Sequence, residues 1–476
     1  MLFNSFDFLV FFIVVTSLYF ACPYKFRWLI LLVASCYFYM DFVPIYILIL
    51  GFTIVIDYFA GLFIERATEP HHRKMLLAAS IVANVGVLAV FKYFNFINLN
   101  IEILLHHFNY HDPIPFLRIL LPIGLSFHTF QAMSYTIEVY RGNQKAEKHF
   151  GIYSLYVMFY PQLVAGPIER PQNILPQLHS EHPFNYNLVV SGLKLMLWGY
   201  FKKLVIADRL ALFVNMVYAH PKSYNGSAVA IALVFFAVQI YCDFSGYTDI
   251  ALGCARVMGF ELMTNFNRPF FSRSVTEFWR RWHISLSSWF NDYLFTPLVV
   301  SVRNWGKFAV VFSLMVTFLI SGVWHGAGWT FVIFGALHGI AIVYEYLTKK
   351  FRKRLSKTVP KIIYNNLSTL LTFLFLIFSW IFFRAKSITD AFTIFRDLKS
   401  FGAEPMHGID ALSLLHPLIA ILILFMVEYK MEYFPQKFNF FASPNIVIRW
   451  GSLIFTGFLI LLLGVFNGPR FIYFQF

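Results

Sequence analysis

The chain has 476 residues, of which 59% are hydrophobic and only 13% are charged. Soluble globular proteins are usually about 45–50% apolar and about 25% charged, so this composition excludes a soluble protein. The formal net charge is +14, which in a soluble domain would suggest nucleic-acid binding. Here the basic residues lie in short loops beside apolar stretches, where the positive-inside rule accounts for them, and we expect no nucleic-acid partner.

Apolar stretches recur along the whole chain, each close to the roughly 20 residues that cross about 30 Å of hydrocarbon. The first, residues 8–22, has no Lys or Arg before it and no small-x-small cleavage site after it. We therefore expect it to remain as a membrane span. A hairpin of two short spans and then one more span lead to the loop 98–116, which has no Lys or Arg and is expected on the outer side.

The later apolar stretches are residues 117–139, 153–165, 188–207, 228–255, 308–323, 329–346, 367–383, 412–427 and 447–466. Several are short or interrupted by Pro and Gly, which favours tilted, broken or re-entrant helices buried in protein. The sequence predicts an all-α polytopic transmembrane helical bundle with roughly eleven to thirteen crossings. It offers no long hydrophilic stretch, so we expect a single integral domain over residues 1–476.

The strongest run of charge lies between residues 349 and 361, which hold seven Lys and Arg residues and no acid. This pattern is typical of a cytoplasmic loop that lies against anionic lipid headgroups. The four cysteines lie in apolar segments without a CxxC pair, so we expect buried free thiols rather than a disulfide or a metal site.

One histidine lies at the junction of two apolar segments, where burying an ionisable side chain costs free energy. His325 lies within the sequence LISGVWHGAGW, whose three glycines allow close backbone approach or a helix break. A histidine can accept a proton from a hydroxyl near neutral pH and return it to a leaving group. His338 follows 13 residues later, on a different face of one straight helix, so the two rings meet only if the helix breaks. The alternative for either residue is a hydrogen bond in helix packing.

Cationic side chains alternate with aromatic ones over residues 278–290. Arg280, Arg281 and His283 lie among rings at about helical spacing, which is typical of a segment at the membrane boundary. The functional alternative is phosphate capture, because guanidinium groups beside a cavity bind phosphate strongly.

Two aspartates, Asp243 and Asp249, lie inside an apolar stretch and need partners there. Pairing with Arg256 or Arg268 is the structural expectation, and binding of a substrate is the alternative. His128, in another apolar stretch, is expected to pack or to line a cavity, with catalysis as the alternative.

Taken together, these segments resemble bacterial membrane-bound O-acyltransferases of the alginate O-acetylation branch. The resemblance rests, in order and spacing, on residues 243–251, 265–270, 278–287 and the Trp-His-Gly motif at 324–326. Flanking similarity extends over residues 121–142, 160–170, 192–209, 380–385 and 471–476, and so over most of the chain.

The resemblance implies an acyl donor supplied from the cytoplasmic side, a central tunnel through the helices, and an acceptor met at the outer face. It also implies that His325, in the Trp-His-Gly motif, is the essential residue, with Trp324 beside it as a candidate for substrate contact. Members that carry D-alanine to teichoic acids place a further histidine in the span that corresponds to residues 369–379. No histidine occurs there, and His338 is the candidate to serve instead.

We therefore expect acetyl transfer from a cytoplasmic thioester, acetyl-CoA, toward hydroxyls of an exported cell-envelope polysaccharide or peptidoglycan. His325 would act as general base, with Arg280 and Arg281 supporting donor or oxyanion charge. No bound cofactor is expected. The resemblance implies the bacterial cytoplasmic (inner) membrane and an exported SGNH-type acyltransferase as partner. The alternatives are transfer of D-alanine or another small acyl group, and a permease whose intramembrane polar residues merely line a solute pathway.

Overall fold

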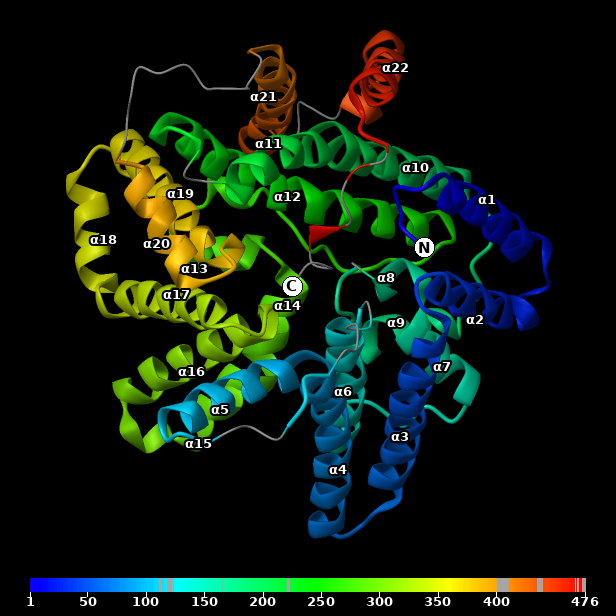
Figure 1. Ribbon diagram of the computed structural model, residues 1–476. Helices are drawn as coiled ribbons and strands as arrows, with labels where there is room; N and C mark the ends of the chain where they lie inside the picture. Colours follow the sequence, from blue (N-terminus) through cyan, green and yellow to red (C-terminus); the bar gives the residue numbers. More distant parts are fainter. Residues whose placement is uncertain are drawn as a thin grey trace. The chain divides into compact units, whose positions relative to one another are not determined.

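The chain is described here by a computed structural model. It describes residues 1–110, 114–117, 122, 124–164, 166–220, 223–399, 411–434, 440–466, 468 and 471–472. The part of the chain within these limits is built from helices and contains no β-strand (Figure 1). This confirms the predicted all-α class.

Long apolar helices make this an integral membrane protein. Within the described ranges, eight helical segments are long and apolar enough to cross a membrane: Pro44–Arg66, Pro70–His107, Gly226–Val257, Lys307–His325, Trp329–Leu347, Lys361–Arg384, Leu414–Tyr433 and Ile446–Leu463. The first apolar helix, Phe6–Ala21, is shorter. Fewer segments meet these limits than the eleven to thirteen expected, because stretches such as residues 153–165 and 188–207 form short or interrupted helices.

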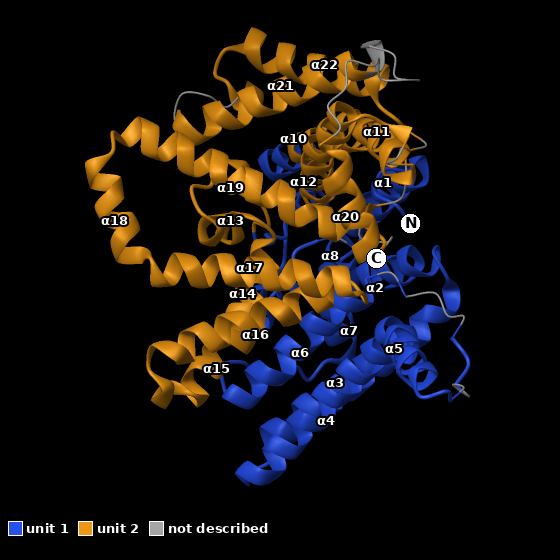
Figure 2. Ribbon diagram, turned by 60° about the vertical axis from the view of Figure 1, so that its left-hand side comes forward, with its two compact units in different colours: residues 1–193, 251–263 blue, residues 194–250, 264–476 orange. Residues whose placement is uncertain are grey.

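The chain divides into two compact units, residues 1–193 with 251–263 and residues 194–250 with 264–476 (Figure 2). Two helices, α10 (Tyr186–Tyr200) and α12 (Gly226–Val257), run from one unit into the other. The expectation of a single integral domain remains a prediction.

The first unit holds the helices of the N-terminal part of the chain. They are α1 (Phe6–Ala21), α2 (Tyr24–Met40), α3 (Ile47–Arg66), α4 (Pro70–Leu88), α5 (Phe94–His107), α6 (Leu125–Arg141), α7 (Phe150–Met158), α8 (Tyr160–Leu163) and α9 (Pro171–Leu178). A buried carboxylate ties three of them together. Asp57 of α3 accepts hydrogen bonds from Ser80 and Asn84 of α4, and Ser80 also contacts Thr136 of α6. Buried charge needs such partners, so this group is explained by packing alone.

The second unit holds the motifs that the sequence singles out. Its helices are α11 (Asp208–Ala219), α13 (Val275–Arg281), α14 (Ile284–Phe290), α15 (Thr296–Ser301), α16 (Lys307–His325), α17 (Trp329–Leu347), α18 (Lys349–Thr358), α19 (Lys361–Arg384), α20 (Ile388–Asp397), α21 (Ala411–Tyr433) and α22 (Ile446–Leu463). Two π-helical segments interrupt this pattern, η3 (Phe201–Ala207) between α10 and α11 and η6 (Asn291–Phe295) after α14.

The second unit contains a tight hairpin of α16 and α17. Its two backbones touch at a pair of glycines, because a Cβ on Gly322 would lie 2.9 Å from the Cα of Gly335. A Cβ on Gly335 would in turn lie 2.4 Å from the carbonyl oxygen of Phe318. Only residues without a side chain permit this approach. Helix α19 also packs against α17.

Candidate active site

The Trp-His-Gly motif forms the turn of the α16–α17 hairpin. His325 is the last residue of α16, and α17 begins at Trp329, so the predicted helix break is confirmed. A Cβ on Gly326 would lie 2.1 Å from the ring of Phe331, so glycine is what lets this ring cover the turn. The sequence therefore places an imidazole at a rigid, closely packed helix end.

The His325 side chain is buried, with 3% of its surface exposed. Its ring contacts the rings of Trp324, Phe334 and Phe383, with centroid separations of 5.0, 5.7 and 5.3 Å. Three aromatic rings therefore enclose the imidazole at the end of α16.

His338 uses both of its ring nitrogens inside the protein. Trp279 Nε1 donates to His338 Nδ1 over 3.1 Å, and His338 Nε2 lies 3.0 Å from Ser379 Oγ. Because an indole N–H can only donate, Nδ1 must accept, and the proton of the neutral ring sits on Nε2. The ring of Phe334 contacts both His338 and His325, at 4.5 and 5.7 Å. The broken helix thus brings both histidines to one aromatic ring.

His283 lies in a strained turn between α13 and α14, where its φ of 44° is in the left-handed region. Its Nδ1 lies 3.2 Å from Asn265 Oδ1, the same oxygen that accepts from Ser285 N and Oγ. That oxygen can only accept, so the proton of His283 is on Nδ1. Burial lowers the pKa of His283 to about 3, and the ring stays neutral. Its ring contacts that of Trp324 at 6.1 Å, which links this turn to the Trp-His-Gly motif.

The two adjacent arginines of α13 have different surroundings. Arg281 forms ion pairs with Glu277 at 2.8 Å and with Glu432 at 2.9 Å, and Glu432 also pairs with Arg268 at 2.7 Å. Arg280 is exposed and has no ion pair or hydrogen bond with any described residue. Only Arg280 therefore keeps its guanidinium available for a ligand.

The partners predicted for the two intramembrane aspartates were wrong. Asp243 pairs with Lys203 at 2.5 Å and Asp249 with Lys202 at 2.7 Å, whereas Arg268 is committed to Glu432. Both lysines belong to the π-helical segment η3. They reach α12 because its backbone touches that of α10. A Cβ on Gly199 would lie only 2.7 Å from the carbonyl oxygen of Gly246.

Lys203 has a second acidic partner, which closes a buried ion cluster. Asp208 lies 2.8 Å from its Nζ, and the other oxygen of Asp243 accepts a hydrogen bond of 2.7 Å from the amide of Ile472. A buried cluster of this kind costs several kcal/mol when one member is removed, because the remaining charges lose their partner. Asp243 and Asp249 therefore hold helices together, as the structural expectation required, but through other residues.

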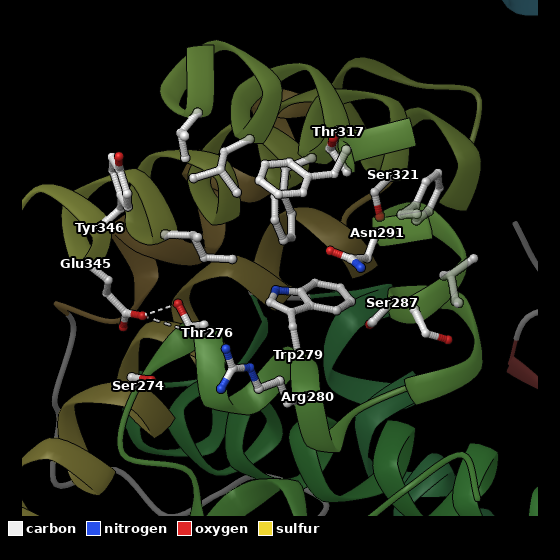
Figure 3. Close-up of a pocket in the computed structure, with 18 of the residues that line it drawn as sticks. Ser274, Thr276, Trp279, Arg280, Ser287, Asn291, Thr317, Ser321, Glu345 and Tyr346 are labelled. Atoms are coloured by element: carbon white, nitrogen blue, oxygen red, sulfur yellow. Dashed lines mark hydrogen bonds between the residues drawn. The ribbon is translucent and has the colours of Figure 1, made fainter. Parts of the chain in front are cut away.

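A cavity of about 800 Å³ lies in the second unit, between α13, α14, η6 and the α16–α18 segment (Figure 3). Its wall includes Arg280 of α13 and, at the junction of α17 and α18, Glu345, Lys349 and Arg352. Glu345 accepts hydrogen bonds from Thr276 N and Oγ1 and pairs with Arg352 at 3.5 Å. The three cations outnumber the single carboxylate, so this group of wall residues, here called the cationic mouth, is positively charged.

The cavity follows one stripe of α16 toward the Trp-His-Gly turn. Leu314, Thr317 and Ser321 line it on successive turns, and Ser321 precedes His325 by four residues. One turn of helix rises about 5–6 Å, so the lined part of the cavity ends roughly that far along the helix from His325. Trp279 projects into the same space in Figure 3 and is the residue that donates to His338.

A comparison with known proteins identifies the family of this chain. A family model described as MBOAT, membrane-bound O-acyltransferase family, matches residues 145–387, slightly more than half of the chain. The chain belongs to the membrane-bound O-acyltransferase family. It is therefore an O-acyltransferase, as the resemblance implied, and it acts on an acyl donor.

Relatives of this acyltransferase are found in several bacteria. The Probable alginate O-acetylase AlgI of Pseudomonas aeruginosa is 35% identical over 429 residues, which cover 89% of this chain and 80% of the relative. The Peptidoglycan O-acetyltransferase of Helicobacter pylori is 34% identical over 420 residues, 82% of this chain and 75% of the relative. The Teichoic acid D-alanyltransferase of Streptococcus thermophilus is 29% identical over 255 residues, 50% of this chain and 60% of the relative.

His128, the remaining predicted site residue, lies in the first unit of the acyltransferase. It is a buried residue of α6 with 2% of its surface exposed, and it is absent from the wall of the cavity. Burial lowers its pKa to about 3, so the ring is neutral. A role for His128 in binding or catalysis remains a prediction.

Two kinds of residue that hold the site of this acyltransferase were not predicted from the sequence. Lys202 and Lys203 lie inside the predicted apolar stretch 188–207, and two cations at such a place are a usable signal. Trp279 and Ser379, which hold His338, give no such signal. An indole and a hydroxyl are ordinary in membrane helices, and only the packing of α13, α17 and α19 brings them to the imidazole.

Proposed function

We propose that this enzyme transfers an acetyl group from acetyl-CoA toward hydroxyls of an exported cell-envelope glycan, in the bacterial inner membrane. The observation that carries the proposal is the wall of the cavity, which combines the cationic mouth with a stripe of α16 that includes Ser321, one helical turn before His325. The donor would enter at the mouth with its phosphates outermost and present its thioester at the inner end.

The mouth suits the phosphates of the donor. Arg280, Lys349 and Arg352 provide three cations, and guanidinium groups bind phosphate through paired, charge-assisted hydrogen bonds. Glu345, the acid at the mouth, is held by Thr276 and Arg352, which offsets its repulsion of an anionic donor. The volume of about 800 Å³ lies within the range of about 300–1,000 Å³ typical of small-molecule sites.

His325 would act as general base. Its neutral imidazole takes the proton of the acceptor hydroxyl as the oxygen attacks the thioester carbonyl, which forms the new C–O bond. When the tetrahedral intermediate collapses, the C–S bond breaks and the thiolate leaves with that proton. The products are an acetyl ester and free CoA. His338, fixed by Trp279 and Ser379, would position the shared ring of Phe334 behind the base.

The acceptor is proposed from the relatives. Two of them are named for alginate or peptidoglycan O-acetylation, and both cover more than four fifths of this chain. We take the acceptor to be a polysaccharide or peptidoglycan hydroxyl, reached through an exported SGNH-type acyltransferase that completes the transfer. Transfer of D-alanine is the second candidate, because a teichoic acid D-alanyltransferase also matches, although over only half of this chain.

The test uses the purified full-length protein in detergent with acetyl-CoA labelled in the acetyl group. The wild type should release free CoA and pass label to an added hydroxyl acceptor such as a short alginate or muropeptide oligosaccharide. His325→Gln should reduce this transfer by at least about a hundredfold, the lower range for loss of a general base. His220→Gln, an exposed histidine of the same unit, is the matched control and should keep full activity. Undiminished transfer by His325→Gln would overturn the assignment, and absence of any acylated product from the wild type would favour the permease.

A further inference from the structure

Helix α18 carries three different stripes along its ten residues. At about 100° per residue, Lys350, Lys353 and Lys357 share one face, and Arg354 borders it. All four are exposed, and none has an ion-pair partner among the described residues. A second stripe consists of Phe351 and Leu355, which are 62% and 39% exposed.

The third stripe of α18 faces the cavity. Lys349 and Arg352, three residues apart, line the cationic mouth, and Arg352 pairs with Glu345 of α17. The four cations of the first stripe take no part in this wall. One short helix therefore presents cations to the cavity on one side and a separate set of cations outward on another.

The position of α18 explains why an exposed apolar stripe accompanies the outward cations. The helix links the end of α17 to the start of α19, both of which are long and apolar enough to cross a membrane. In Figure 2 it runs across the ends of these two helices, and so along the surface of a bilayer that they would cross. An amphipathic basic helix in this place buries its apolar side chains at the interface and directs its lysines to the headgroups.

We propose that the outward stripe of α18, Lys350, Lys353 and Lys357, binds the anionic headgroups of phospholipids. The occupant is a lipid because Phe351 and Leu355 are exposed on another face of the same helix, next to Arg354, and need an apolar environment. An acidic protein would meet the positive charge but would leave the apolar stripe to water. Charge complementarity is strong, since α18 has no acidic residue.

The headgroup contact has a consequence for the cavity, which rests on the proposed function. Lipid held by the outward stripe restrains the same helix that sets Lys349 and Arg352 at the mouth. Loss of anionic lipid should therefore weaken donor binding and raise the KM for acetyl-CoA, while kcat changes little.

Lipid binding is tested without the donor, so that its failure is separate from failure of the proposed activity. The full-length protein in detergent is titrated with dimyristoyl phosphatidylglycerol and, in parallel, with the zwitterionic phosphatidylcholine, and bound lipid is counted by native mass spectrometry. The wild type should prefer phosphatidylglycerol. The triple variant K350Q/K353Q/K357Q should lose roughly ten- to a hundredfold in phosphatidylglycerol affinity, the scale expected for three lysine–headgroup contacts.

Two control variants test whether lipid binding depends on the charge of these residues and on their position in the chain. K350R/K353R/K357R keeps the charge and should keep the affinity. K74Q/K145Q/K148Q removes three exposed lysines of the first unit and should change it less than threefold. Equal affinity of wild type and K350Q/K353Q/K357Q, at unchanged thermal stability, would overturn the proposal. So would equal binding of the two lipids, or preferential capture of an acidic acyl-carrier protein over phosphatidylglycerol by the same stripe.

Discussion

Arg280 and Arg281 are neighbours of the same type, but their surroundings differ. Arg280 is exposed at the cationic mouth without an ionic partner, whereas Arg281 holds Glu277 and Glu432. We predict that Arg280→Ala raises the KM for acetyl-CoA and leaves thermal stability unchanged. Arg281→Ala should lower the melting temperature and leave the KM of the remaining folded enzyme near its wild-type value.

The size of the first effect follows from the chemistry of one guanidinium. A hydrogen bond to a charged group contributes about 1.5–3 kcal/mol, and the lower end applies at an exposed mouth that keeps Lys349 and Arg352. About 1.4 kcal/mol corresponds to a tenfold change, so we expect a KM increase of roughly tenfold. For Arg281→Ala, the loss of its contacts with two partly buried carboxylates should cost about 1–3 kcal/mol of folding stability.

The assay compares two donors. Initial rates are measured with acetyl-CoA and with S-acetyl-pantetheine, which has the same thioester but no phosphates. Arg280→Ala should weaken binding of acetyl-CoA only, and this effect should shrink at high salt because exposed charges are screened. An equal KM change for both donors, or no change for either, would refute the assignment of Arg280 to the phosphates.

Three further predictions concern stability. Gly322→Ala should lower the melting temperature by several degrees, because its Cβ would lie 2.3 Å from a backbone oxygen. Gly328→Ala should be tolerated, because the atom nearest to its Cβ would be 3.7 Å away. Differential scanning fluorimetry checks both variants. Lys203→Met should lower the free energy of unfolding by about 3–5 kcal/mol, because two buried carboxylates lose their cationic partner. An unchanged midpoint of thermal or denaturant unfolding would contradict the ion cluster. The pKa of His283 is lowered to about 3 by burial, from about 6.5 in an unfolded chain, so its neutral ring contributes full stability above pH 6.5 and loses it as the pH falls toward 3. When the pH is lowered from about 7 to about 4.5, the His283→Gln variant should therefore lose less folding stability than the wild type. An equal fall of the melting temperature in the two proteins over this pH range would disprove this.

Helix class and the site of the central turn could be predicted from the sequence because they depend on local features. Long apolar stretches permit only helices in a bilayer, and the glycines around His325 indicate a break in one of them. The structure has both, with α16 ending at His325 and α17 beginning at Trp329.

The partners of the intramembrane aspartates could not be predicted from their neighbours in the sequence. The candidates were Arg256 and Arg268, yet Asp243 pairs with Lys203, 40 residues upstream, and Asp249 pairs with Lys202, 47 residues upstream. Which cation reaches an acid depends on which helices touch. That contact is set by glycines on α10 and α12, whose role becomes visible only when the two backbones are placed together.

The cavity and the different surroundings of the two arginines also could not be predicted from the sequence. Periodicity places Arg280 and Arg281 on one helix but does not tell which of them meets Glu432, 151 residues later. The wall of the cavity combines side chains from α13, α14, η6, α16, α17 and α18, so it depends on tertiary packing rather than on any motif.

The central claim is that the cavity carries the acyl donor to His325. Its most direct test is a cryo-electron microscopy structure of the full-length enzyme with an acetyl-CoA analogue in which a methylene group replaces the thioester sulfur, so that the acetyl group cannot be transferred. We predict phosphate density against Arg280 and Lys349, and an acetyl carbonyl about 5 Å from the His325 imidazole. That separation lets an acceptor hydroxyl lie between them, hydrogen-bonded to the imidazole and about 3–3.5 Å from the carbonyl carbon. Ligand density that leaves this cavity empty, or an acetyl group held away from His325 by the rings of Phe334 and Phe383, would contradict the account.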